Sequence, residues 1–180
     1  MFEKIDRFGF VDEIEWVHRD RNGKVIKRYC SNSRWNRLLR RLRLKGHECI
    51  VAVGMANMAG LLLTDIGGTA YDYIAIGIGT GAAVVGDTAL GTQKGVRQAG
   101  VGTRITVTQT NDTAKLVATF SKAIDATLTG TDAITEVGVF YDAAGVTVSM
   151  LWRQTFTAES MAWDSGDTIE MTCKTQMKQG

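Results

Sequence analysis

Alternating polar and apolar positions near the start of the chain predict a β-hairpin. Residues 12–18, DEIEWVH, alternate with period two, as expected of a strand with one buried face. Residues 20–23, DRNG, follow, and Asn-Gly is the strongest short-range hairpin signal. Residues 24–29, KVIKRY, supply the returning strand. We therefore expect residues 1–32 to form an N-terminal hairpin arm.

The hydrophobic period becomes helical after residues 31–33, SNS, which are favourable helix N-cap residues. An apolar stripe at i, i+3, i+4 and i+7 is formed by Trp35, Leu38, Leu39 and Leu42. A second, buried helix is expected over residues 51–63, and the apolar run that contains it is too short to span roughly 30 Å of membrane hydrocarbon. The pattern predicts a two-helix insertion over residues 33–66.

Short strands separated by turns are expected in the rest of the chain. The six segments with strand-like patterns are residues 73–78, 104–109, 115–120, 135–141, 146–152 and 168–174. With the hairpin they make about eight strands, mostly antiparallel because their connections are short and contain no helix. We expect a mainly β protein whose body, residues 70–180, is a jelly-roll-like antiparallel β-sandwich.

Composition agrees with a single globular domain over residues 1–180. Hydrophobic residues make up 44% of the chain and charged residues 22%, which excludes a disordered protein. Proline is absent, which excludes collagen and polyproline linkers. The 20 glycines suit a β protein with many turns.

Charge divides the chain into a basic and an acidic part. Residues 1–50 hold 13 Lys/Arg and 7 Asp/Glu, net +6, whereas residues 51–180 hold 8 and 12, net −4. The basic excess is greatest on the first predicted helix, residues 33–45. Its candidate protein-interface residues are Arg34, Trp35, Arg37, Arg40, Arg41 and Arg43. We expect them to contact an acidic protein neighbour, including other copies of this chain; nucleic acid, a membrane surface and simple solvation are the alternatives.

The glycine-rich stretch at residues 77–82, GIGTGA, matches the loose dinucleotide-binding fingerprint. That chemistry needs a helix to begin at the glycines, so that its N-terminal amides hold pyrophosphate. Residues 83–88, AVVGDT, are poor helix formers, and no second βαβ unit follows. We therefore expect a loop between strands, and no cofactor.

Catalytic and metal motifs are also missing from the sequence. The chain has two histidines, His18 and His47, and no G-x-S-x-G, H-E-x-x-H or acidic calcium loop. Asp164, Asp167 and Glu170 fall at positions typical of solvated carboxylates, although a spatial carboxylate pair of the glycosidase type stays open. We expect no enzyme activity.

The three cysteines are odd in number and contain no C-x-x-C. Met1–Phe10 carries charges in place of the apolar region of a signal peptide, so we expect reduced thiols in a protein made in the cytoplasm. A zinc site from Cys30, His47 and Cys49 lacks a fourth ligand and finger-like spacing. No metal site is expected.

Two stretches resemble small structural proteins of tailed bacteriophages. Residues 73–81, YIAIGIGTG, with residues 86–91, GDTALG, are similar to a "Y-I-A-x-G-x-G-T … D-T-x-L-G" block of those proteins. Residues 134–145, ITEVGVFYDAAG, with residues 150–156, MLWRQTF, and residues 166–169, GDTI, resemble their "E-x-G-L-F … M-L-x-R … F … G-D-x-L" ending.

The resemblance implies a non-enzymatic virion component, assembled in the host cytoplasm and placed in head decoration, head–tail joining, or tail or fibre attachment. Its expected partners are copies of itself and other virion proteins, with no small-molecule substrate and no membrane. One alternative is a nucleic-acid-binding module that uses residues 33–45. The other is a carbohydrate-binding or glycan-degrading tail sandwich.

Overall fold

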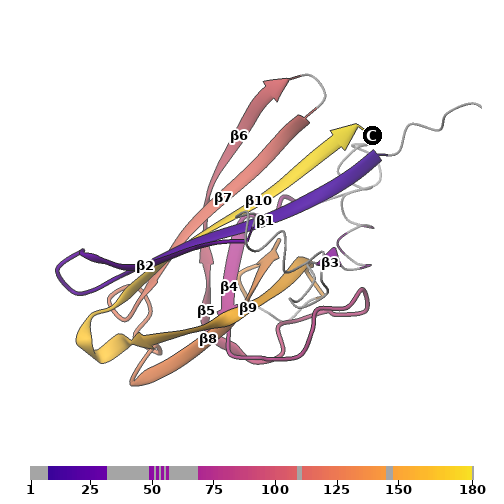
Figure 1. Cartoon of the computed structure of the whole chain (residues 1–180). Coiled ribbons are helices and arrows are strands. Elements are labelled where there is room, and N and C mark those ends of the chain that lie inside the picture. Colours follow the sequence, from indigo (N-terminus) through magenta and orange to yellow (C-terminus); the bar gives the residue numbers. More distant parts are fainter. Residues whose placement is uncertain are drawn as a thin grey trace, which may run out of the picture.

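The computed structural model describes residues 8–31, 49, 50, 52, 54, 56, 69–108, 111–144 and 148–179. This part of the chain is mainly β and forms two five-stranded antiparallel sheets (Figure 1). The first sheet has the order β2 (Val25–Cys30), β1 (Phe8–Arg19), β10 (Thr168–Gln179), β7 (Asn111–Ser121) and β6 (Val101–Thr108). The second has the order β3 (Cys49–Ile50), β9 (Met150–Ala162), β8 (Thr131–Phe140), β4 (Tyr73–Gly77) and β5 (Gln93–Ala99). A short 3₁₀ helix, η1 (Trp163–Ser165), joins β9 to β10.

The core lies between the two sheets, so the β-sandwich-like arrangement is confirmed. Alternate residues of each strand point inward, as the pleat requires. Fully buried core side chains from both sheets include Ile14, Trp16, Ile74, Ile76, Phe120, Val137, Trp152, Ile169 and Met171. Trp152 also crosses the interior, because its Nε1 donates a hydrogen bond to Thr175 Oγ1 at 3.0 Å. Burial of these apolar faces, at about 25 cal/mol per Å², is the main stabilising term.

The predicted N-terminal hairpin is confirmed and its turn has the expected chemistry. Asp20 Oδ1 accepts hydrogen bonds from the backbone N–H of Asn22 and Lys24, both at 2.9 Å. Gly23 adopts φ +77°, which glycine reaches without strain. Along its whole length β1 also pairs with β10, from Phe8 opposite Gln179 to Arg19 opposite Thr168.

Several strand boundaries differ from the sequence prediction. The strand predicted at residues 115–120 already begins at Asn111, since residues 111 and 112 belong to β7 rather than to a turn. The strand predicted at residues 146–152 begins only at Met150 and continues to Ala162. Strand β5 was not predicted at all.

One chain segment changes sheets at Gly100. Strand β5 is the end strand of the second sheet and β6 is the end strand of the first, and only Gly100 separates them. Its N–H donates to the Asp72 carbonyl at 2.7 Å, and a Cβ here would lie 2.5 Å from the Leu116 side chain. The same segment therefore forms the edge of both sheets along one side of the sandwich (Figure 1).

The two-helix insertion predicted for residues 33–66 is not seen in the described part of the chain. Its basic helix, with all six candidate interface residues, lies outside the described residues. Of the second predicted helix, Ala52, Gly54 and Ala56 are described, and all three are helical. The strand order does not establish a jelly-roll connectivity, which stays a prediction. None of the helical segments with described residues is long and apolar enough to cross a membrane.

Candidate functional site

The glycine-rich connection from β4 to β5, residues 78–92, forms a layer on the outer face of the second sheet. Val137 and Val139 of β8 face the core, so their neighbours Glu136 and Gly138 point to the other side. Leu90 of the loop packs there in a separate apolar cluster with Ala75, Phe140 and Met150. The loop has no helix, so the prediction of a loop in place of a dinucleotide fold is confirmed.

Glu136 is fully buried under this loop and receives its backbone. Its Oε1 accepts hydrogen bonds from the N–H groups of Gly79 (2.8 Å) and Thr92 (2.9 Å), and its Oε2 accepts one from Gly91 (3.0 Å). Arg153 Nε donates to Oε2 at 2.7 Å. Burial by itself raises the pKa of Glu136, but these four hydrogen bonds outweigh it and hold the pKa below its usual value.

Arg153 connects this carboxylate to the rest of the loop. One terminal nitrogen donates to Asp87 Oδ2 and the other to the Gly81 carbonyl, each at 2.9 Å. Burial lowers the pKa of Arg153, yet its hydrogen bonds and ion pairs with Asp87 and Glu136 raise it above the ordinary value. Asp87 Oδ2 in turn accepts the Val84 N–H at 2.9 Å. This buried Glu136–Arg153–Asp87 network therefore clamps the loop at several points.

The same network explains the glycine spacing. A Cβ on Gly77 would lie 2.5 Å from Glu136 Oε1 and 2.5 Å from the Thr92 carbonyl, and one on Gly79 would lie 2.5 Å from Glu136 Oε1. These glycines let the backbone approach a protein carboxylate, where a dinucleotide fold would bring it to a pyrophosphate. A Cβ on Gly81 would meet nothing within 4 Å.

Replacing Gly77 with alanine is expected to destabilise the protein by about 1–3 kcal/mol, because the Thr92 carbonyl is backbone and cannot move aside. Chemical denaturation measures this change. Gly81→Ala is the matched control and should change the unfolding free energy by less than about 0.5 kcal/mol. Equal effects of the two substitutions would show that close packing does not explain the glycine at residue 77.

A second polar group, centred on Arg97, packs against Phe140 of the outer apolar cluster. Arg97 on β5 forms an ion pair with Asp142 and donates to Ser149 Oγ at 2.7 Å. Its guanidinium carbon lies 3.7 Å from the centre of the Phe140 ring, a cation–π contact. Burial lowers the pKa of Arg97, and the Asp142 carboxylate opposes that shift. The charge of Arg97 is therefore turned inward, away from solvent.

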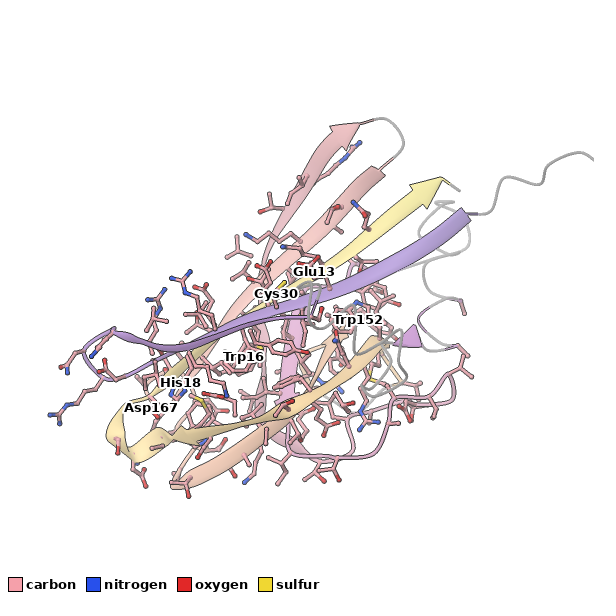
Figure 2. All side chains as sticks on the ribbon, in the orientation of Figure 1. Glu13, Trp16, His18, Cys30, Trp152 and Asp167 are labelled. Carbon is pink, nitrogen blue, oxygen red and sulfur yellow. The ribbon has the colours of Figure 1, made fainter. Side chains whose placement is uncertain are left out.

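His18, at the end of β1, lies buried between two carboxylates. Its Nδ1 is 2.7 Å from Glu159 Oε1, and its Nε2 is 3.0 Å from Asp167 Oδ2 (Figure 2). The second contact is within ion-pair distance but lacks hydrogen-bond alignment, so Nε2 has no hydrogen-bond partner among the described residues. Lys27 pairs with the other oxygen of Glu159. His18 thus links β1, β9 and the start of β10, a structural role that its sequence position did not reveal.

The C-terminal acids behave differently from one another. Asp164 is exposed, as expected, and contacts Lys122 Nζ at 2.6 Å and the Gly130 N–H at 2.9 Å. Both hydrogen bonds help to hold the pKa of Asp164 below its usual value. The prediction of a solvated carboxylate is wrong for Asp167, which is buried beside His18 and accepts the Ala162 N–H at 2.9 Å. Asp164 and Asp167 therefore have separate partners.

Two cysteines have described side chains, Cys30, which is half-buried, and Cys173, which is buried. Cys30 Sγ lies 3.4 Å from Glu13 Oε1 on the outer face of the first sheet (Figure 2). Glu13, Glu15 and Cys30 together are a donor set that could hold a metal, which the sequence reasoning missed. Lys174 already balances one of the two carboxylate charges, since its Nζ is 2.8 Å from Glu15 and 3.4 Å from Glu13. The alternative zinc ligands of the sequence analysis, His47 and Cys49, have no described side chains.

An apolar groove of about 380 Å³ opens between the sheets. Residues that line it from both sides include Tyr71, Arg104, Leu116, Val139, Leu151 and Cys173. Its walls are almost entirely apolar, so it suits packing more than acid–base chemistry.

The structure brings together Asp87, Glu136 and Arg153 of the resembling stretches, and the basic-helix candidates lie outside its described part. Comparison with protein-family models, with curated proteins and with solved structures found no significant match.

Proposed function

We propose that this chain is a structural component of a tailed-phage virion, in head decoration, head–tail joining or tail or fibre attachment. The observation that supports the proposal is the buried Glu136–Arg153–Asp87 network. Its residues come from both stretches that carry the resemblance, and Arg153 is 66 positions from Asp87. These three of the residues that carry the resemblance therefore form a single hydrogen-bonded network in the fold.

A rigid network of this kind suits a protein that works by binding partner proteins through its surface. Three side chains and the backbone of one loop are held rigid by charge-assisted hydrogen bonds, which lowers the entropy lost when the loop contacts a partner. The carboxylates and cations of the described network are all engaged with one another. Their arrangement favours a framework role for the site.

The proposed main contact is the basic segment, residues 33–45, with an acidic neighbour. Residues 51–180 carry a net charge of −4, so one copy offers a complementary surface to the basic segment of another. Arginine forms bidentate pairs with carboxylates, and Arg and Trp are enriched among interface hot spots. Arg34, Trp35, Arg37, Arg40, Arg41 and Arg43 are the residues proposed for this contact.

The double variant Arg37→Glu/Arg41→Glu is expected to fold normally but to be lost from assembled particles. Quantitative mass spectrometry of purified particles, complemented with tagged wild-type or variant protein, measures this incorporation. Arg21→Glu/Lys24→Glu is the matched control, because it changes the net charge equally at two exposed residues of the β1–β2 turn.

Three results would contradict the proposal. Normal incorporation of the double variant would show that the basic segment does not make the proposed contact. Absence of the wild-type protein from purified particles would show that the protein is not a virion component. Salt-dependent binding to duplex DNA, or glycan hydrolysis by the purified protein, supports the corresponding alternative instead.

A further inference from the structure

The apolar groove between the sheets, which measures about 380 Å³, has a buried floor and an exposed rim. Leu116 and Cys173 of the first sheet and Val139 and Leu151 of the second form the floor, and none of them is more than 6% exposed. The rim includes residues of the β6–β7 hairpin, which extends beyond the second sheet in Figure 1. The groove therefore leads from the surface into the space between the sheets.

The register of β6 and β7 determines which side chains point into the groove. Arg104 lies directly opposite Ala114, and Gly102 lies directly opposite Leu116. Residues opposite one another in an antiparallel pair share a face of the sheet, and Leu116 belongs to the core between the sheets. Arg104 therefore points to the inner face, at the rim. Lys115, which stands between Ala114 and Leu116 on β7, points to the outer face.

The absence of a side chain at Gly102 leaves room in the groove. A Cβ on Gly102 would point to the same face as Leu116 but would meet no described atom within 4 Å. Packing at the neighbouring Gly100 is tight by comparison, since a Cβ there would lie 2.5 Å from the Leu116 side chain. Protein interiors are normally close-packed, and apolar walls around an unfilled space lose dispersion contacts. A ligand in the groove would restore those contacts.

Arg104 gives the rim of the groove a positive charge. Its side chain is exposed, and no described residue that lines the groove is acidic. The hydroxyl groups of two other lining residues, Tyr71 and Thr175, are hydrogen-bonded within the protein, to the Gly54 carbonyl and to Trp152 Nε1. A guanidinium has several N–H donors and matches a carboxylate bidentately, so it can bind an incoming carboxylate beside its contacts within the protein. The charge at the rim therefore favours an anionic group.

We propose that the groove binds a free medium-chain fatty acid, whose alkyl chain lies on the apolar floor and whose carboxylate pairs with Arg104 at the rim. Small-molecule sites are typically apolar with a few polar groups that fix orientation, and they measure about 300–1,000 Å³. The groove, at about 380 Å³, lies near the lower end of that range, which favours one alkyl chain over the two of a phospholipid. Fatty-acid binding does not depend on the proposed virion role, because it belongs to the single chain.

Isothermal titration calorimetry of the full chain with octanoate, decanoate and dodecanoate, each below its micelle-forming concentration, tests the proposal. We expect a negative heat-capacity change, because apolar surface is buried on binding. The affinity should rise about tenfold for each two methylenes added, until the groove is filled. Dodecyltrimethylammonium, which has a chain of similar length and a cationic head group, should bind about tenfold or more weakly than dodecanoate.

Two pairs of variants separate the floor from the rim. Gly102→Phe should fill the groove and abolish binding, whereas Val101→Phe, at the 74% exposed neighbouring residue that points to the other face, should leave the affinity within about twofold. Arg104→Gln should weaken dodecanoate binding about tenfold or more and reduce the preference over dodecyltrimethylammonium. Lys115→Gln removes the same charge on the outer face and should change neither value by more than about twofold. Circular dichroism and melting temperature check that every variant is folded.

Absence of binding at about 1 mM decanoate overturns the proposal. So does binding that Gly102→Phe leaves unchanged, or an affinity that does not depend on chain length. If Gly102→Phe does not fold, Arg104→Gln and its Lys115 control decide. A dimer that Gly102→Phe dissociates, in a protein that binds no fatty acid, would assign the groove to a second copy instead. The virion role is read separately, from the presence of the protein in particles.

Discussion

Replacing Arg153 with methionine is expected to lower the free energy of unfolding by about 3–5 kcal/mol. Methionine keeps much of the side-chain volume but leaves Glu136, which is fully buried, without its cationic partner. The Gly81 carbonyl and Asp87 each lose the hydrogen bond from Arg153 at the same time, while Asp87 keeps the one from the Val84 N–H. Urea denaturation followed by fluorescence of the buried tryptophans measures the change.

The charge of Glu136 supplies the control for this prediction. Because the pKa of Glu136 is held below its usual 4.5 in the folded state, its ionisation stabilises the protein above about pH 4.5, and this contribution is lost as the pH falls further. In Glu136→Gln that part of the acid destabilisation should be absent. Combining Arg153→Met with Glu136→Gln should cost less than the sum of the two single changes, since no uncompensated charge stays buried. Simple additivity would contradict the role assigned to the network.

Replacing His18 with leucine is expected to cost a similar amount, about 3–5 kcal/mol. Leucine fills the space but leaves Glu159 and Asp167, which are both buried, without the group between them. Thermal and urea unfolding measure the loss. The effect should be larger than that of removing an exposed partner, because solvent cannot compensate for these two carboxylates.

The matched variant of His18→Leu also removes the two carboxylates, Glu159 and Asp167, that lose their contact with the imidazole. His18→Leu combined with Glu159→Gln and Asp167→Asn should recover part of the lost stability. A second control, Asp164→Asn, changes an exposed carboxylate of the same connection and should lower the unfolding free energy far less than His18→Leu does. If His18→Leu behaves like Asp164→Asn, the histidine does not hold β1 to β9 and β10.

Local signals explain which strands could be predicted. The β1–β2 hairpin depends on an Asn-Gly turn and on alternation within a few residues, and both are visible in the sequence. Strand β5, QKGVRQA, has no such alternation, contains Gly95 at φ +66°, and carries Lys94 and Arg97. Those two charges become compatible with a strand only through partners 38 and 45 positions away.

The candidate site likewise combines residues that are noticeable in the sequence with contacts that depend on distant parts of the chain. The glycines, Asp87, Glu136 and Arg153 were all noticed in the sequence as motif residues, but their meeting point depends on how β4, β8 and β9 pair. A useful signal was present, because Glu136 directly precedes the apolar residues 137–140, VGVF, of strand β8. An unpaired carboxylate in such a buried strand would be too costly. His18 and Glu159, separated by 141 positions, offered no comparable local pattern.

The pairing of β1 with β10 also bears on the order of folding. Strand β10 lies between β1 and β7 in the first sheet, yet it is synthesised after both of them. Until β10 leaves the ribosome, β1 and the β6–β7 hairpin do not share a neighbouring strand, and their apolar faces stay exposed to solvent. A newly made chain is thus most vulnerable to aggregation and proteolysis just before β10 is inserted.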